Sequence, residues 1–119
     1  MAWSSRQKGN VRENKVVAIL EQHGYVCFPS RGSRGIDLIC INTEDRHAPH
    51  LAIEVGGPSK AIAASFESLN EAKKPLGTVS LVVRELKRKG RCFFRWHIHP
   101  QAFYDDADVT TALKVVREL

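Results

Sequence analysis

The sequence predicts an α/β domain in which helices flank a mixed central sheet. Apolar runs at helical spacing alternate with short runs rich in β-branched and aromatic residues. Their order is helix, three strands, helix, two strands, helix, so helices both precede and follow a three-stranded meander. With 119 residues and 43% hydrophobic content, the chain has the size and composition of one domain with one core. We therefore expect a single domain over residues 1–119.

The bounds of each element follow from the residues that end each apolar run. In the first helix Val16, Val17 and Leu20 recur at helical spacing, and Gly24 follows as a stop signal. Asp108 is the expected N-cap of the last helix. The expected helices cover about 10–23, 60–73 and 108–119, and the expected strands cover 25–28, 36–41, 51–55, 78–83 and 92–98. A glycine-containing loop is expected at 29–35, and a basic turn at 84–91.

The second and third expected strands form a hairpin, because a polar connection joins two apolar runs. If Ile41 lies opposite about Leu51, the numbers of paired positions add up to about 91 or 92. Asp37 then falls beside Glu54 or the residue that follows it.

Three carboxylates converge in this arrangement. Asp37 and Glu54 interrupt apolar strands, and Glu13 lies on the core-facing stripe of the first helix, three positions before Val16. Buried like charges about 5 Å apart repel unless a cation lies between them. Carboxylate oxygens on a rigid hairpin suit Mg²⁺, with Mn²⁺ as a substitute. The expected metal ligands are therefore Asp37, Glu54 and Glu13, and the expected chemistry is metal-dependent phosphodiester hydrolysis.

The sequence around these acids resembles the PD-(D/E)xK nuclease signature and, more closely, the archaeal-type Holliday junction resolvases. The likeness runs over residues 8–55 without a gap before the hairpin loop, and more loosely to about residue 100. Its motifs are Lys8-Gly9-x-x-x-Glu13, Leu20-Glu21-Gln22-His23-Gly24-Tyr25, Ser30-x-Gly32-Ser33-x-x-Ile36-Asp37-Leu38 and Ile53-Glu54-Val55.

The resemblance implies a restriction-endonuclease-like α-β-β-β-α-β core and a homodimer that nicks two opposed strands of a four-way DNA junction with Mg²⁺. Glu13, Asp37 and Glu54 match the family's acidic catalytic residues, and Ser30 matches a serine implicated in its active site. The expected partner is branched DNA, with no small-molecule substrate. Two alternatives stay open, namely a nuclease that acts on flaps or DNA ends and a junction-binding protein without catalysis.

The sequence departs from the signature at its lysine. The signature places a lysine two residues after Glu54, and Gly56 stands there. Lys60 begins the second expected helix and is the candidate replacement, as a group that orients water and offsets transition-state charge. Alternatively, the metal and Arg31 or Arg34 suffice, or cleavage has been lost.

The charge balance suits a polyanionic partner. Lysine and arginine number 18 against 13 acidic residues, a formal net charge of +5. Contacts of this kind bind the DNA backbone without reading sequence, and the basic turn expected at 84–91 is a further source. The expected DNA-binding residues are Arg6, Lys8, Arg12, Lys15, Arg31 and Arg34.

The remaining features indicate an ordinary intracellular protein. No apolar run approaches the roughly 20 residues that span a bilayer, and the N-terminus lacks a secretory signal, so we expect no membrane and a cytoplasmic location, or a host's cytoplasm if a phage encodes the chain. The cysteines, Cys27, Cys40 and Cys92, are expected to be reduced core side chains. His97 and His99 are expected at a strand edge, and the C-terminal aromatic residues in the core or a dimer interface.

Overall fold

The computed structural model describes residues 5–30, 35–72 and 74–119, and for residues 5–10 it describes the backbone alone. The chain forms three α-helices and six strands in these ranges. The helices are α1 (Ser5–Glu21), α2 (Ile62–Glu71) and α3 (Val109–Arg117), the last preceded by the short 3₁₀ helix η1 (Asp106–Asp108). The strands are β1 (Tyr25–Pro29), β2 (Leu38–Asn42), β3 (Leu51–Gly56), β4 (Val79–Arg88), β5 (Arg91–His99) and β6 (Ala102–Asp105).

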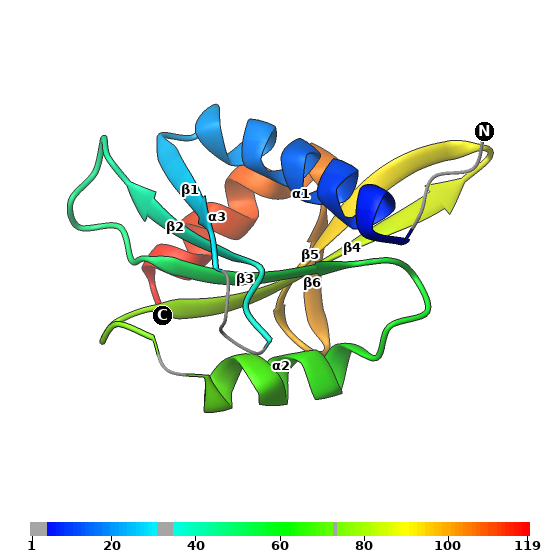
Figure 1. The fold of residues 1–119 in the computed structure, drawn as a ribbon. Coiled ribbons are helices and arrows are strands. Elements are labelled where there is room, and N and C mark those ends of the chain that lie inside the picture. The colour runs from blue at the N-terminus through cyan, green and yellow to red at the C-terminus, as the bar shows by residue number, and fades with distance from the viewer. Residues whose placement is uncertain (1–4, 31–34, 73) are drawn as a thin grey trace.

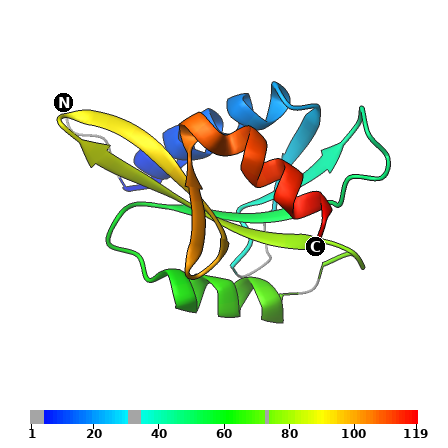
Figure 2. The same cartoon turned by 180° about the vertical axis from the view of Figure 1, so that it is seen from behind.

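The six strands form one mixed sheet in the order β1-β2-β3-β4-β5-β6. Neighbouring strands are antiparallel except β3 and β4, which are parallel. A parallel pair needs a crossover connection, and α2 supplies it. Helices α1 and α3 lie on one face of the sheet and α2 on the other (Figures 1 and 2). The predicted α/β class with a mixed, helix-flanked sheet is therefore confirmed.

Each face of the sheet has its own apolar cluster, because side chains of a strand alternate between faces. On the α1 and α3 side, Val16 and Leu20 of α1 pack with Leu51, Leu81 and Trp96 of the sheet, and all five are at most 1% exposed. A smaller cluster joins the other face to α2. Its buried members are Ile36, Ala52, Phe66, Leu69 and Val82. The crossover helix is thus fixed directly over β3 and β4.

Several expected bounds differ from the observed ones. Helix α1 begins five residues earlier than expected, at Ser5, and ends at Glu21, where Gly24 (φ +86°) turns the chain in a conformation that favours glycine. Strand β6 was not expected. Asp108 precedes α3 as predicted, but its side chain makes no capping hydrogen bond.

The largest difference concerns the basic turn expected at 84–91, which is wrong. Residues 84–88 belong to β4, and the turn consists of Lys89 (φ +52°) and Gly90 (φ +77°) alone. Two successive positive φ angles match the tight turns that join twisted strands. The hairpin is therefore long, and Arg84 lies well inside the sheet and is 1% exposed. No helix in the described ranges is long and apolar enough to cross a membrane.

Candidate active site

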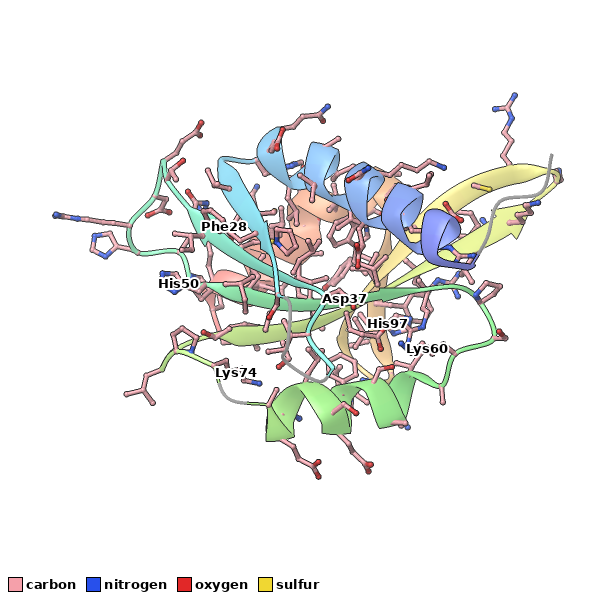
Figure 3. All side chains as sticks on the ribbon, viewed as in Figure 1. Phe28, Asp37, His50, Lys60, Lys74 and His97 are labelled. Carbon is pink, nitrogen blue, oxygen red and sulfur yellow. The ribbon has the colours of Figure 1, made fainter. Side chains whose placement is uncertain are left out.

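Asp37 and Glu54 lie side by side, as the hairpin register predicts. The paired numbers of β2 and β3 add up to 91, as in Leu38↔Ile53, and Asp37 is the residue directly before Leu38. Asp37 immediately precedes β2, and Figure 3 labels it there. Its backbone N–H donates to the carbonyl of Ile53 (2.8 Å), and its Oδ2 accepts a hydrogen bond from the backbone N–H of Val55 (2.8 Å). The other carboxylate oxygen of Asp37, Oδ1, takes no part in the hydrogen bond with Val55.

Glu54 is the most buried of the predicted acids and is paired with Arg84 of β4. Its side chain is 3% exposed, and that of Arg84 is 2% exposed. Arg84 donates from Nη1 to Oε1 (2.7 Å) and from Nη2 to Oε2 (3.2 Å), a two-pronged ion pair. Arg84 also donates to Ser65 Oγ (2.7 Å), which ties the pair to α2. Burial acts to raise the pKa of Glu54, but the hydrogen bonds and charge of Arg84, with Ser65 and Lys60, lower it overall.

Lys60 reaches the same carboxylate from the segment before α2. Its Nζ lies 3.4 Å from Glu54 Oε1, and its side chain is 57% exposed. Figure 3 labels it at that end of the crossover. The structure therefore brings the candidate replacement lysine to the predicted acid pair. Lys74 lies elsewhere, since its Nζ donates to the carbonyl of Leu69 (2.6 Å) and to Ser80 Oγ (2.9 Å).

Gly56 leaves the space that Arg84 and Lys60 occupy. It pairs with Arg84 across β3 and β4. A Cβ atom at this position would lie 3.1 Å from Arg84 Nη1, 3.1 Å from Lys60 Cδ and 3.3 Å from Glu54 Oε1. Gly56 stands where the signature has its lysine, and the space beside it is filled by two cationic side chains from neighbouring segments.

Glu13 completes the acidic set from α1. Burial raises its pKa, and the charge of Asp37 raises it further. The pKa of Asp37 is also raised, by burial first and by the charge of Glu54, although Val55, Lys60 and Arg84 act in the opposite direction. The charge of Asp37 therefore acts on Glu13, and the charge of Glu54 acts on Asp37. Among the described residues Asp37 and Glu13 form no ion pair, whereas Glu54 is paired with Arg84 and Lys60.

Ser30 contacts the site through its backbone, since its N–H donates to the carbonyl of Asp37 (3.0 Å). A cavity of about 260 Å³ adjoins Glu54. It is lined by Glu54 and Lys60 together with small side chains, among them Ala64, Ser65 and Ser68 of α2. Space for part of a substrate is therefore available beside the Glu54 carboxylate.

The predicted DNA-binding residues fall into two groups. Arg12 Nε and Lys15 Nζ lie 3.2 and 3.4 Å from the carboxylate of Glu85 on β4, so α1 and the β4–β5 hairpin share one charged surface. Arg31 and Arg34 lie outside the described residues, as do the side chains of Arg6 and Lys8.

The expected site, in which Glu13, Asp37 and Glu54 share a metal ion, is not seen among the described residues. Among residues 11–30, 35–72 and 74–119, no three histidine, cysteine, aspartate or glutamate side chains are placed to hold a metal ion. Both oxygens of Glu54 are bound by Arg84, whereas Asp37 keeps an oxygen outside its backbone bond. Oxygen donors of Asp37 and Glu13 suit Mg²⁺ chemically, and Glu54 does not fit as a ligand in this arrangement.

Two smaller expectations are wrong. His97 is not at an exposed edge but buried, 3% exposed, and neither ring nitrogen has a hydrogen-bond partner among the described residues. Burial and the charge of Arg95 lower its pKa, which favours the neutral ring. Cys92 is exposed rather than in the core. Of the C-terminal aromatic residues, Trp96 and Phe94 are buried and Phe103 is 45% exposed.

Sequence reasoning missed Arg84, the residue that holds Glu54. The signal that could have revealed it is the Lys89-Gly90 pair, which marks a tight turn. A turn there extends the strand through Arg84, and alternation then places Arg84 on the same face as Val82.

No protein-family model matches the chain, and no curated protein sequence is significantly similar to it. The likeness to junction resolvases therefore depends on the motifs alone. The positions of the acids, and of Lys60 and Arg84 beside Glu54, are the main support for a function.

Proposed function

We propose that this chain is a structure-selective DNA endonuclease that resolves four-way junctions by paired nicks. The observation that carries the proposal is the electrostatic interaction among three carboxylates, Glu13, Asp37 and Glu54, together with the pairing of Glu54 with Lys60 and Arg84. The observed order α1-β1-β2-β3-α2-β4 agrees with the α-β-β-β-α-β order that the resemblance implies, which supports the proposal.

Each residue has a role in this proposal. Asp37 and Glu13 would hold Mg²⁺, which when bound would polarise the scissile phosphodiester. Glu54 fixes Arg84 and Lys60 at the site rather than binding the ion. Lys60, the more exposed of the two cations, would contact the phosphate, and Ser30 would support Asp37 through the backbone. Arg12 and Lys15 would contribute backbone contacts to DNA.

A homodimer and a cytoplasmic location belong to the same proposal. Two nicks in opposed strands require two active sites, one from each copy. Val26 and Phe28 on the edge strand β1 are 41% and 51% exposed and would supply apolar surface for a second copy. Sedimentation of the purified protein as a monomer at micromolar concentration would contradict the dimer.

A specific observation favours a second candidate function. Arg84 already balances the negative charge of Glu54, so this carboxylate needs no metal ion beside it. This arrangement suits a protein that binds branched DNA and does not cut it.

One assay separates the two candidates. The protein is incubated with a four-way junction, a flap and a linear duplex of matched sequence, in Mg²⁺, Mn²⁺ or EDTA. We expect paired nicks in the junction that require the metal. Asp37→Asn should abolish the nicks and leave junction binding intact, because removing negative charge reduces repulsion of phosphates. Glu118→Gln, which removes an exposed charge near the C-terminus, is the matched control.

Each other outcome has a defined meaning. Binding without nicks in either metal supports the second candidate, and nicks confined to the flap or to DNA ends indicate a nuclease of different specificity. A separate measurement tests the metal site. Mg²⁺ or Mn²⁺ should raise the melting temperature of the wild-type protein and of Glu118→Gln but not that of Asp37→Asn.

A further inference from the structure

Cys27 and Cys40 face each other on neighbouring strands at one edge of the sheet. They pair directly in the antiparallel register of β1 and β2. The two sulfur atoms lie 2.8 Å apart, with Cys40 Sγ donating to Cys27 Sγ. Cys40 is buried and Cys27 is half-buried on β1, which is the edge strand of the sheet. Both side chains belong to the α1 side of the sheet.

We propose that Cys27 and Cys40 are a redox-modification site that forms a reversible cross-strand disulfide. The backbone already meets the geometric requirement. Residues directly opposite on antiparallel strands have Cα atoms about 4.5–5.5 Å apart, within the roughly 4.4–6.8 Å that a disulfide spans. Strand pairing therefore has no need to change when the bond forms. The inference is independent of the proposed nuclease function.

The surroundings assign different roles to the two thiols. The hydrogen bond from Cys40 lowers the pKa of Cys27, although burial and the charge of Glu21 act in the opposite direction. The same hydrogen bond, and burial, raise the pKa of Cys40. Cys27 is thus both the more accessible thiol and the one more readily ionised. Since the thiolate is the attacking species, Cys27 reacts first.

The oxidant is a low-molecular-weight disulfide such as oxidised glutathione. The Cys27 thiolate attacks one sulfur of this disulfide, forms a mixed disulfide and releases one glutathione. Cys40 then loses its proton, attacks Cys27 Sγ and releases the second glutathione. The protein loses two electrons and two protons, and one glutathione disulfide becomes two thiols. The hydrogen bond that raises the pKa of Cys40 is lost in the mixed disulfide, which favours the second step.

The bond would enclose the segment that connects β1 to β2. The two cysteines are 13 positions apart, and the ring between them contains Ser30 and Asp37. Closing a ring of this length restricts the unfolded chain. We therefore expect oxidation to raise the melting temperature by about 5–10 °C and reduction to reverse the change.

The experiment is oxidation of the full chain in buffers of graded glutathione ratio, followed by acid quenching, alkylation and peptide mapping. Cys92, the exposed third cysteine, is the internal reference. We expect a Cys27–Cys40 cross-linked peptide in the oxidised protein, with Cys92 either free or carrying glutathione, and a loss of two hydrogen atoms in mass in the Cys92→Ser variant.

The variants make the test decisive. Cys92→Ser should oxidise as the wild type does, whereas Cys27→Ser should form no internal bond. Because Cys40 is fully buried, Cys40→Ala is used with a circular-dichroism check of folding, and it should accept glutathione at Cys27 without resolving it. The proposal is overturned if Cys27 and Cys40 both stay open to alkylation while Cys92 is modified, or if the only disulfide found joins two chains.

Discussion

Replacing Arg84 by methionine tests how much the buried ion pair with Glu54 contributes to the free energy of unfolding. Methionine keeps much of the length of the arginine side chain and removes its charge. Glu54, 3% exposed, would then be a buried carboxylate that keeps, among the described residues, only the ion pair with the largely exposed Lys60. Breaking a buried pair from one side costs about 3–5 kcal/mol, which is a large part of the 5–15 kcal/mol that stabilises a typical domain. We expect Arg84→Met to lose about 3 kcal/mol at pH 7, since Lys60 offsets part of the charge.

The pH dependence of this loss identifies its cause. In the wild type the pKa of Glu54 lies below its ordinary value, so ionised Glu54 adds stability above that value. Without Arg84, burial is the largest remaining influence and raises the pKa. Ionised Glu54 then opposes folding at neutral pH, and protonation relieves the penalty as the pH falls through the raised pKa. The difference between the two proteins should therefore shrink on acidification.

Urea denaturation followed by circular dichroism measures this difference at pH 7 and at about pH 5. The double variant Arg84→Met with Glu54→Gln should recover most of the loss, because no uncompensated charge is then buried. A loss below about 1 kcal/mol at pH 7, or one that is equal at both pH values, would refute the reasoning.

Two further predictions concern neighbouring positions. Gly56→Lys should not restore the signature lysine but should destabilise the protein by about 1–3 kcal/mol, because its Cβ would lie only 3.1 Å from Arg84 Nη1. Ser59→Lys, at an exposed position, is the control. A higher urea midpoint for Gly56→Lys than for the wild type would contradict this reasoning. Asp37→Asn should stabilise the protein by about 0.5–1 kcal/mol at neutral pH, because the raised pKa of Asp37 means that its ionisation opposes folding. That gain should vanish when the pH falls below 3.8, the ordinary pKa of an aspartate. If the variant and the wild type differ in stability by the same amount at pH 7 and below pH 3.8, ionisation of Asp37 does not oppose folding.

The sequence predicted those parts of the fold that local patterns determine. Val16 and Leu20 identify the buried face of α1, and the lengths of two apolar runs set the β2–β3 register that brings Asp37 beside Glu54. These features depend on periodicity and on a single connection. The same information placed Glu13 and Lys60 near the acids.

The sequence did not predict the parts that depend on tertiary pairing. Arg84 lies in a charged stretch that looks like a solvated turn, and only the parallel pairing of β3 with β4 shows that it is buried against Glu54. Cys27 and Cys40 look like separate core residues until β1 and β2 are aligned. Strand β6 is four residues long and lies at the other edge of the sheet, where a short polar-flanked run gives little signal.

The position of the Glu54–Arg84 pair on two parallel strands also has a kinetic consequence. The hairpins β2–β3 and β4–β5 join neighbours in the chain, whereas these two charges are 30 positions apart and meet only after α2 has crossed the sheet. Contacts that close long loops tend to form late, since their entropy must be lost before they stabilise anything. We therefore expect the pair to slow unfolding of the finished domain more than it speeds folding.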